Sequence, residues 1–301
     1  MAWMQNVRDR MRERRLKRLG VPALRGDSHE SLRAINEGGS VFVMGNGPSA
    51  IPALKYVREH YPDALSFASN AGAKLLTPSF YVFVDAFGLL EYGQLIDIEK
   101  TTAIIQPSAI GKIRNSLEAE KPELVQHIRK VCENPKTLRL EREKRDRRLD
   151  LDPYLRIASG YTVGAVSLQL AMMTLLPKLD ATRASDAKSV NQVVPGASER
   201  GPARWASEPK PGKIIVAGMD GYDISKPSYF DNTLIESAED INRDELAERH
   251  RNTNIWQEAV MIQVIALAAV HGLEVLNLSQ PGKLGVNELC RCEEFDREQE
   301  T

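Results

Sequence analysis

Cysteine is scarce in this chain of 301 residues. Only Cys132, Cys290 and Cys292 occur, and they are too few and too unevenly placed to form a disulfide scaffold. Cys290 and Cys292 lie too close together for a relaxed bridge, and they lack the CxxC spacing of a metal site. These absences exclude a small disulfide-rich secreted protein and predict a protein of the reducing cytoplasm.

Long hydrophobic runs and an excess of one charge are missing as well. No run approaches the ~18 apolar residues that a membrane-spanning helix needs, and the formal net charge is −1. A nearly neutral chain argues against nucleic-acid binding through bulk charge, so no nucleic-acid partner is expected. With 42% hydrophobic and 27% charged residues, the composition is that of an ordinary soluble globular protein.

Residues 1–20 are basic and lack the apolar segment of a secretory signal. Trp3, Met4, Val7 and Met11 fall at helical spacing, with arginines on the other face. Two placements fit this pattern: an exposed helix packed on the main domain, which is the commoner case, or an interfacial helix on anionic lipid. The second placement would make the protein peripheral at the inner face of the membrane.

Strand and helix patterns alternate along the chain, which predicts an α/β fold with a Rossmann-like, mostly parallel sheet and covering helices. Short apolar runs predict the strands, and longer periodic segments predict the helices. The predicted strands are residues 41–44, 64–70, 79–85, 101–107, 137–140, 213–220 and 273–279. The predicted helices are residues 50–60, 114–131, roughly 160–176 and 254–271.

The same patterns predict one α/β domain over residues 37–285. A basic helical extension (residues 1–36) precedes it, and a charged tail (residues 286–301) follows it. Residues 177–212 are rich in Pro, Ser, Ala and charge and show no sustained period, which predicts a disordered insertion inside the domain.

Ligands of open parallel sheets bind at the carboxyl ends of the strands, so residues directly after the predicted strands are the first candidates for a site. The first strand is followed by Gly45, Asn46, Gly47, Pro48 and Ser49. The two glycines permit a tight turn and leave no side chain between main chain and ligand, and proline suits the first turn of a helix. An ordinary strand-to-helix junction explains the same residues. Further polar candidates at strand ends and helix starts are Asn70, Asp85, Ser159, Asp220 and Tyr222.

The segment RIASG repeats this pattern before the helix near residue 160. Ser159 and Gly160 open that helix, and Arg156 lies just upstream. Free backbone N–H groups and the positive end of the helix dipole suit an anionic group, although a serine that only caps its helix is the commoner case.

Two tyrosines and a histidine complete the set of candidates. Tyr222 and Tyr229 lie in a polar, proline-containing segment after a buried strand, where their hydroxyls could bond a phosphate. Tyrosines are more often amphipathic filling of a core. His250 precedes the sequence RNTNIWQ at the start of the long helix, where most histidines are surface residues.

Together these pieces resemble the bacterial sialyltransferases of glycosyltransferase family 42. The matching features occur in the family's order and span residues 41–280. They are the GNGPS turn, RIASG before the central helix, G-x-D-x-Y with a second tyrosine several residues on, and a histidine just before an NT helix start. The resemblance implies a single-domain glycosyltransferase-A-like sheet with a small lid at about residues 221–249.

The resemblance also implies a reaction. Family members bind a CMP-activated, sialic-acid-like sugar and transfer it to a hydroxyl of a glycan acceptor with inversion and without a metal or other cofactor. Tyr222 and Tyr229 would bond the departing phosphate, and Arg156 would assist electrostatically. His250 would remove the proton of the acceptor hydroxyl, a task for which a histidine pKa needs little tuning. Residues implied around the substrates are Gly45, Asn46, Gly47, Pro48, Ser49, Asn70, Asp85, Ser159, Gly160 and Asp220.

One residue departs from the family pattern and keeps a second function open. Asp85 stands where the family has an asparagine, and with Asp220 it could hold Mg²⁺ for ATP. That arrangement would suit the archaeal-type 6-hydroxymethylpterin diphosphokinases, a related family that shares the GNGPS turn and the strand-end G-x-D. A non-catalytic nucleotide-sugar-binding protein is a third alternative, motivated by the irregular insertion. The sequence leaves the acceptor and self-association into a homo-oligomer open.

Overall fold

The structure is a computed structural model of the chain. It describes residues 26–27, 32, 39–110, 121–140, 162–175, 212–221, 243–281 and 284–299. The predicted N-terminal helix over residues 1–20 and most of the predicted insertion, residues 177–211, lie outside the described residues. Two clusters of buried hydrophobic residues lie within the described ranges.

An eight-stranded sheet forms the middle of the molecule, and every neighbouring pair of strands in it is parallel. The order of the strands across the sheet is β1-β6-β5-β4-β3-β2-β7-β8. This confirms the predicted α/β class with a Rossmann-like parallel sheet. The strands are β1 (Gly26–Asp27), β2 (Ser40–Met44), β3 (Leu65–Ala68), β4 (Phe80–Phe83), β5 (Thr102–Ile105), β6 (Leu138–Arg139), β7 (Lys213–Ala217) and β8 (Glu274–Asn277).

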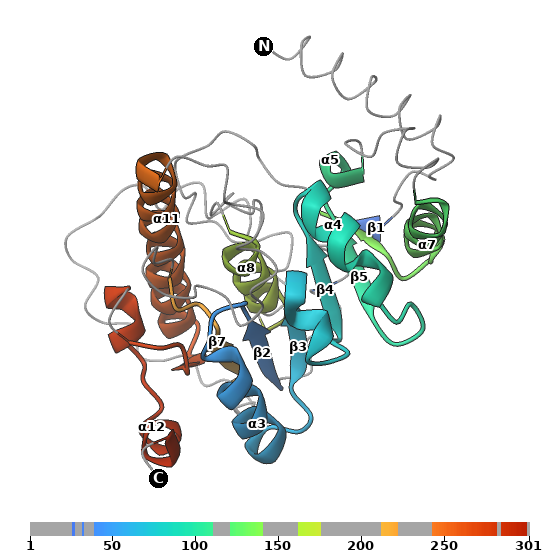
Figure 1. Ribbon diagram of the computed structural model, residues 1–301. Helices are drawn as coiled ribbons and strands as arrows, with labels where there is room; N and C mark the ends of the chain where they lie inside the picture. Colours follow the sequence, from blue (N-terminus) through green and yellow to red (C-terminus); the bar gives the residue numbers. More distant parts are fainter. Residues whose placement is uncertain are drawn as a thin grey trace, which may run out of the picture.

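Helices cover both faces of this sheet, giving three layers (Figure 1). The α-helices are α3 (Ala50–His60), α4 (Ala86–Tyr92), α5 (Pro107–Ile110), α7 (Pro122–Glu133), α8 (Val163–Leu175), α11 (Arg243–Val270) and α12 (Glu293–Gln299). Short 3₁₀ turns are η1 (Asn70–Lys74), η2 (Gly93–Leu95) and η4 (Gly285–Glu288). Because strands and helices alternate along most of the chain, most crossovers place an α-helix on one face of the sheet, whereas the β3–β4 connection contains only η1.

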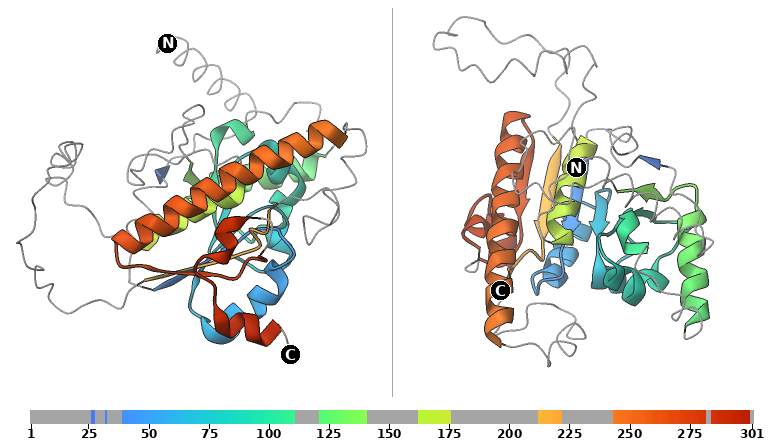
Figure 2. Two further views of the ribbon diagram at one scale, coloured as in Figure 1. Left: turned by 90° about the vertical axis from the view of Figure 1, so that its left-hand side faces the viewer. Right: turned by 90° about the horizontal axis from the view of Figure 1, so that it is seen from above.

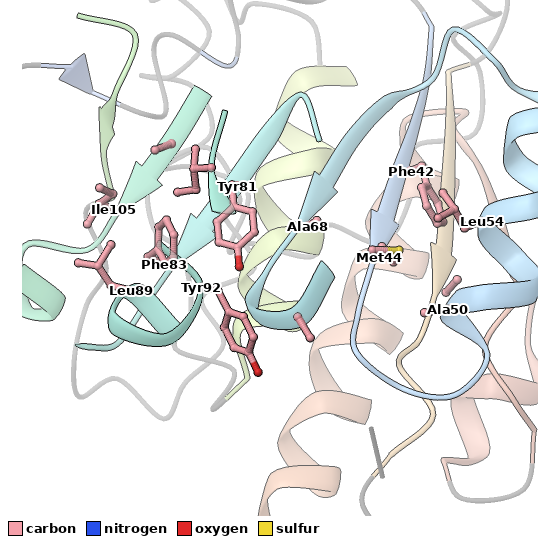
Figure 3. Close-up of a cluster of buried hydrophobic side chains, with 14 of the residues drawn as sticks. Phe42, Met44, Ala50, Leu54, Ala68, Tyr81, Phe83, Leu89, Tyr92 and Ile105 are labelled. Carbon is pink, nitrogen blue, oxygen red and sulfur yellow. The ribbon is translucent and has the colours of Figure 1, made fainter. Parts of the chain in front are cut away.

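Successive side chains of each strand point to opposite faces of the sheet, so the buried residues form two clusters, one on each face. Phe42 and Met44 of β2 face the side covered by α3, α4, α7 and α12, and they belong to the same cluster as Tyr81 and Phe83 of β4, with Ala68 of β3 between the two pairs (Figure 3). Val41 and Val43 face the side covered by α8 and α11. The side chains of both β2 pairs are almost completely buried, as expected of a central parallel strand.

The two helices on the second face lie side by side, α8 against β2 and β3 and α11 next to it toward β8 (Figure 2). All the residues of α8 are buried, which explains why its sequence is apolar on every side. The long helix α11 packs across α8 and turns the side chains of Val260, Met261, Val264 and Ala268 toward it. By length and composition, residues 250–270 of α11 are apolar enough to cross a membrane, contrary to the expectation from the sequence.

The direction of the chain across the sheet reverses at one place. From β2 the chain proceeds through β3, β4, β5 and β6 toward one edge, and it then returns to β7 on the other side of β2. In open α/β sheets the crevice at such a switch point, at the carboxyl ends of the two strands, is the usual place for a ligand.

Three predicted boundaries differ from the observed ones. Helix α11 begins at Arg243 rather than near residue 254, so residues 243–249 of the predicted lid belong to a helix. Its first turns contain Glu, Ala and Arg, which are strong helix formers, so the polarity of the segment does not interrupt the helix. At the other end of the chain, β1 pairs with β6 and adds part of the predicted extension to the sheet edge.

The predicted charged tail is also part of the domain. Helix α12 packs on α3, where the ring of Phe295 meets the ring of Tyr56 edge-on with centroids 5.4 Å apart. Phe295 and Cys292 are buried among residues that are mostly charged. Few apolar side chains, each buried, are enough to hold this segment against the domain.

Candidate functional site

The turn after β2 lies against the segment after β7, at the switch point of the sheet. The N–H of Gly45 donates to Ala217 O, and the N–H of Gly47 donates to Gly218 O, both at 2.8 Å. A Cβ atom added to Gly45 would come within 2.3 Å of Gly218 O. The glycine at position 45 therefore permits two backbones to touch, in addition to any role toward a ligand.

Ser49 and Asp220 form a latch between these two segments. The N–H and Oγ of Ser49 donate to the carboxylate of Asp220 at 2.8 and 2.5 Å, and Gln280 N donates to the same carboxylate at 2.6 Å. Ser49 Oγ also accepts a hydrogen bond from Gly218 N at 2.9 Å. Asp220 is 1% exposed, and three donors compensate its burial. The latch fixes the carboxyl ends of β2 and β7 relative to each other.

The backbone of Met219, the residue before Asp220, is fixed by hydrogen bonds to residues after β8 and on α11. Its N–H donates to Ser279 Oγ at 3.2 Å. Its carbonyl oxygen accepts hydrogen bonds from the amides of Gln257 at 3.2 Å and Asn287 at 3.1 Å. All of these side chains are buried. The segment from β7 to Gly221 is thus determined by contacts from three different parts of the chain.

A pocket opens beside the latch and encloses about 410 Å³, with open solvent at its mouth included. Its walls come from the turn after β2, the start of η1, the start of α8, the segment after β7 and one residue of α11. The lining residues are Gly45, Asn46, Gly47, Asn70, Thr162, Val163, Gly164, Gly218, Met219, Asp220, Gly221 and Gln257.

The start of α8 gives this pocket an electropositive wall. Thr162 Oγ1 accepts a hydrogen bond from Ala165 N at 3.0 Å and caps the helix. The backbone of Val163 and Gly164 borders the pocket, and the N–H groups of a first helical turn have no acceptor within the helix. Because α8 runs away from the pocket into the core, its positive dipole end is directed at any ligand there.

Three strands are each followed in the sequence by a residue whose buried side-chain oxygen has no hydrogen-bond partner among the described residues. These oxygens are Asn46 Oδ1 after β2, Ser69 Oγ after β3 and Gln106 Oε1 after β5. Asn46 is 8% exposed and lines the pocket. Buried polar groups are nearly always paired, so an orphaned acceptor in a pocket indicates a place for a donor group of a ligand.

Asn70 adopts a backbone conformation that is uncommon for a residue with a side chain. Its φ is 46°, and its carbonyl oxygen accepts a hydrogen bond from the hydroxyl of Tyr81. Asparagine tolerates this region better than most residues, which suits it to the tight start of η1. The turn places Asn70 on the wall of the pocket, as its position at a strand end predicts.

Asp85 has a local role instead. Its carboxylate accepts a hydrogen bond from Gly88 N at 2.8 Å and caps α4, and its side chain is exposed. Between β4, which precedes Asp85, and β7, which precedes Asp220, lie β3 and β2. Three steps of roughly 4.8 Å put these strand ends about 14 Å apart. Two oxygens on one Mg²⁺ are at most about 4 Å apart, so the pair does not fit a shared ion.

One group of potential metal ligands occurs among the described residues, and it lies elsewhere. It comprises Glu59, His60 and Glu298, whose ligand atoms lie within 4.8 Å of one another. All three side chains are exposed at the end of α3, where His60 Nε2 lies 3.4 Å from a carboxylate oxygen of Glu298. Because α3 begins at the pocket and runs away from it, this group is at the opposite edge of the sheet.

His250 lies within α11 rather than before it. The strands β7 and β8 are parallel, so α11 between them begins at the carboxyl edge of the sheet. Gln257, seven residues further on, touches the pocket. A separation of two helical turns places His250 on the same face of α11, about 10 Å beyond Gln257. The histidine is half-buried at this position.

The structure thus brings some of the predicted site residues together and leaves others undescribed. In the pocket wall are Gly45, Asn46, Gly47, Asn70 and Asp220. Pro48 and Ser49 complete the adjoining turn, Asp85 caps α4, and His250 is on α11. Arg156, Ser159, Gly160, Tyr222 and Tyr229 lie outside the described residues.

Several residues of the pocket were not predicted. Thr162, Gly164, Gly221 and Gln257 contribute to its wall. Of these, Gln257 left a signal in the sequence, because it is a polar residue in line with the apolar positions 260, 264 and 268 of the same helix face. The others are small residues whose role depends on which segments meet.

Comparisons with protein families, with curated proteins and with solved structures find no match for this chain.

Proposed function

We propose that the protein is a glycosyltransferase that moves a sialic-acid-like sugar from a CMP-sugar to a hydroxyl of a glycan acceptor, with inversion. The observation that carries the proposal is the pocket at the switch point of the sheet, formed around Asn46 and the start of α8. A nucleotide is the ligand class that such a crevice most often binds.

The lining of the pocket supports a nucleoside monophosphate. The start of α8 offers free backbone N–H groups to a phosphate. The orphaned Oδ1 of Asn46 can accept a hydrogen bond from an amino or hydroxyl group of the base or ribose. Gly45, Gly47 and Gly221 contribute backbone atoms to the pocket wall, and backbone N–H and C=O groups are available there to a base or a ribose.

The position of His250 supports its role as the general base. The nucleotide would occupy the pocket near Gln257, and His250 lies about 10 Å further along the same helix face. This interval leaves room for the donor sugar between the nucleotide and the acceptor hydroxyl. A base at that distance from the leaving group, on the far side of the sugar, is what inversion requires, because the nucleophile attacks opposite the leaving group.

The remaining roles extend from residues at the pocket. Tyr222 follows Gly221 directly in the chain, and Ser159 and Gly160 precede Thr162 by two or three positions. We assign Tyr222 and Tyr229 to the departing phosphate and Arg156 to electrostatic assistance. A monophosphate develops less charge than a diphosphate, so hydroxyl donors and a helix start can replace a metal ion.

A panel of nucleotides separates this function from its alternatives. The melting temperature is measured with CMP, UDP, GDP and ATP, each with Mg²⁺ and with EDTA, because a ligand of the native state raises it. CMP is expected to stabilise the protein equally in both conditions. If ATP were the only nucleotide that raised the melting temperature, and did so only when Mg²⁺ was present, the result would contradict the proposal and favour the diphosphokinase-like alternative.

Turnover is tested separately. Wild type and His250→Ala are incubated with a CMP-sugar and a panel of glycan acceptors, and released CMP and glycosylated product are quantified. The wild type is expected to form product, and His250→Ala is expected to lose at least 100-fold in rate, on the order of a missing general base. Binding of the CMP-sugar without product in any pairing would favour the non-catalytic alternative.

A further inference from the structure

Two side-chain amides donate to the carbonyl oxygen of Met219, and they use their hydrogen-bonding capacity to different extents. The Nδ2 of Asn287 donates at 3.1 Å, and the Nε2 of Gln257 donates at 3.2 Å. Asn287 is completely buried, and it also donates to Gln280 O at 3.0 Å and accepts from Asn277 Nδ2 at 3.3 Å. Among the described residues, Gln257 uses its amide for the single hydrogen bond to Met219. The fold therefore engages both ends of the Asn287 amide but only the nitrogen end of Gln257.

The unused part of the Gln257 amide belongs to the pocket. A primary amide carries two N–H donors and one oxygen acceptor, so one N–H and Oε1 are left after the bond to Met219. Gln257 is 5% exposed and lines the pocket. Because buried polar groups are nearly always paired, this amide indicates a ligand group that can both donate and accept.

The bond to Met219 fixes which end of the amide is offered to a ligand. A carbonyl oxygen can only accept, so the nitrogen end of Gln257 has to face Met219 O. Exchange of the two ends would place one acceptor against another. Met219 is itself held by Asn287 and by the hydrogen bond from its N–H to Ser279 Oγ at 3.2 Å. The oxygen of Gln257 is therefore preorganised, which lowers the cost of binding a donor group there.

Gln257 lies between the start of α8 and His250. Met219 connects Gln257 to α8, because its Cε atom lies 2.9 Å from the place of a Cβ on Gly164, in the first turn of that helix. His250 is on the same face of α11 as Gln257, about 10 Å further along. In the proposed function the start of α8 holds the phosphate and His250 faces the acceptor hydroxyl. The group that spans this interval is the transferred sugar.

We propose that Gln257 binds the transferred sugar of the CMP-sugar. Its Oε1 accepts a hydrogen bond from a sugar hydroxyl, and its remaining N–H donates to an oxygen of the same sugar. A hydroxyl can donate and accept, so it matches the two groups that the bond to Met219 leaves over. This inference rests on the proposed function, because it takes the nucleotide site as given and adds a residue that recognises what the nucleotide carries.

The proposal separates affinity for the sugar from affinity for the nucleotide. Calorimetric titration in EDTA measures the dissociation constants of CMP and of CMP-3-fluoro-N-acetylneuraminate, a CMP-sugar whose fluorine slows cleavage. Gln257→Met is expected to bind CMP within about twofold of the wild type and the CMP-sugar about tenfold more weakly, since only neutral hydrogen bonds to the sugar are lost. Gln257→Leu is measured alongside. Both variants should fold, because Met219 O keeps its bond to Asn287.

Three further variants serve as controls. Asn46→Ala should weaken CMP and the CMP-sugar by the same factor, because Asn46 is assigned to the nucleotide. Gln263→Met makes the same substitution on α11 at a residue outside the pocket lining, and it should change neither dissociation constant. Ser279→Ala removes a different hydrogen bond of Met219, so any structural disturbance should shift both ligands together.

The outcomes distinguish this inference from the proposed function. Equal weakening of CMP and the CMP-sugar in Gln257→Met would assign Gln257 to the nucleotide and overturn the inference, as would unchanged affinity for both. A selective loss of the CMP-sugar in Ser279→Ala, as large as in Gln257→Met, would assign the effect to the placement of Met219 and overturn it too. If CMP does not bind the wild type, the proposed function itself is wrong.

Discussion

The turn after β2 and the turn after β4 both place a short polar residue directly before a helix, Ser49 before α3 and Asp85 before α4. Asp85 caps its own helix by accepting a hydrogen bond from Gly88 N. Ser49 makes no such bond within its turn and instead joins Asp220, 171 residues away in the chain. The first arrangement stabilises one helix, whereas the second fixes the shape of a pocket between two strands.

This difference separates polar residues that serve local structure from those that build the site. Asp85 and Asp220 look alike in the sequence, since each follows a predicted strand. Only Asp220 is buried, and only its neighbourhood includes the pocket with the orphaned oxygen of Asn46. Substitutions at the Ser49–Asp220 latch should therefore affect both stability and the pocket, whereas substitutions at Asp85 should affect stability alone and by a smaller amount.

The largest effect is expected from Gly45→Ala. Its Cβ would lie 2.3 Å from Gly218 O, a backbone atom that cannot move without breaking the β2–β7 ladder. We expect a loss of about 3 kcal/mol or more in the free energy of unfolding, measured by urea denaturation, or failure to fold. Gly39→Ala is the control, because its Cβ would meet nothing within 4 Å. Equal stability of the two variants would contradict the close approach of the backbones.

Asp220→Ala should come next. It leaves Ser49 N, Ser49 Oγ and Gln280 N without their acceptor in a buried place. The expected loss is about 3 kcal/mol, measured as above. Ser49→Ala removes one side of the same latch, so the double variant should lose less than the sum of the two single losses. Full additivity would show that the two side chains do not act together.

Asp85→Ala should cost about 1 kcal/mol, the usual value of a lost helix cap. Asp85→Asn keeps the cap and should leave stability within about 0.5 kcal/mol of the wild type. Neither variant should change nucleotide affinity or its response to Mg²⁺. Loss of a Mg²⁺-dependent activity in Asp85→Asn, with the fold intact, would overturn the local role assigned here.

A smaller effect is expected at low pH in the half of the sheet that contains Asp85. Burial lowers the pKa of His127 on α7, against a hydrogen bond to the Gly93 backbone that raises it. The unfolded chain then binds more protons than the native state near and below about pH 6.5, so stability falls on acidification.

His127→Gln should therefore lose less stability than the wild type between pH 7.5 and pH 5.5, as measured by urea midpoints. Partial desolvation lowers the pKa of His271, an exposed residue, as well, so part of the acid sensitivity should remain in this variant. If His127→Gln lost as much stability between the two pH values as the wild type does, the result would contradict a half-buried His127 that is neutral in the native state.

Much of the fold could be predicted because its information is local. Short apolar runs such as residues 41–44 and 213–217 become parallel strands, and the turn residues between them limit where they end. Asn46 and Asn70 could be proposed as site residues for the same reason, since the carboxyl ends of parallel strands share one edge of the sheet.

Other features depend on long-range packing that no local pattern records. The latch between Ser49 and Asp220 and the support of Met219 by Asn287 join distant segments. The start of α11 was missed because its first turns are charged, yet their intrinsic preference for helix prevails. The sequence of the C-terminal segment predicts a tail because Phe295 is a single apolar residue among charged ones, and its burial against Tyr56 depends on packing with α3.

The central claim, that the pocket beside the latch binds a pyrimidine monophosphate, is tested most directly by calorimetric titration of CMP in EDTA. Asn46→Ala removes an oxygen that has no hydrogen-bond partner among the described residues, so stability should be unchanged while affinity falls. The account predicts binding to wild type and Asp85→Asn alike and at least tenfold weaker binding to Asn46→Ala, about 1.4 kcal/mol. No heat of binding for the wild type, or equal affinity for Asn46→Ala, would contradict it.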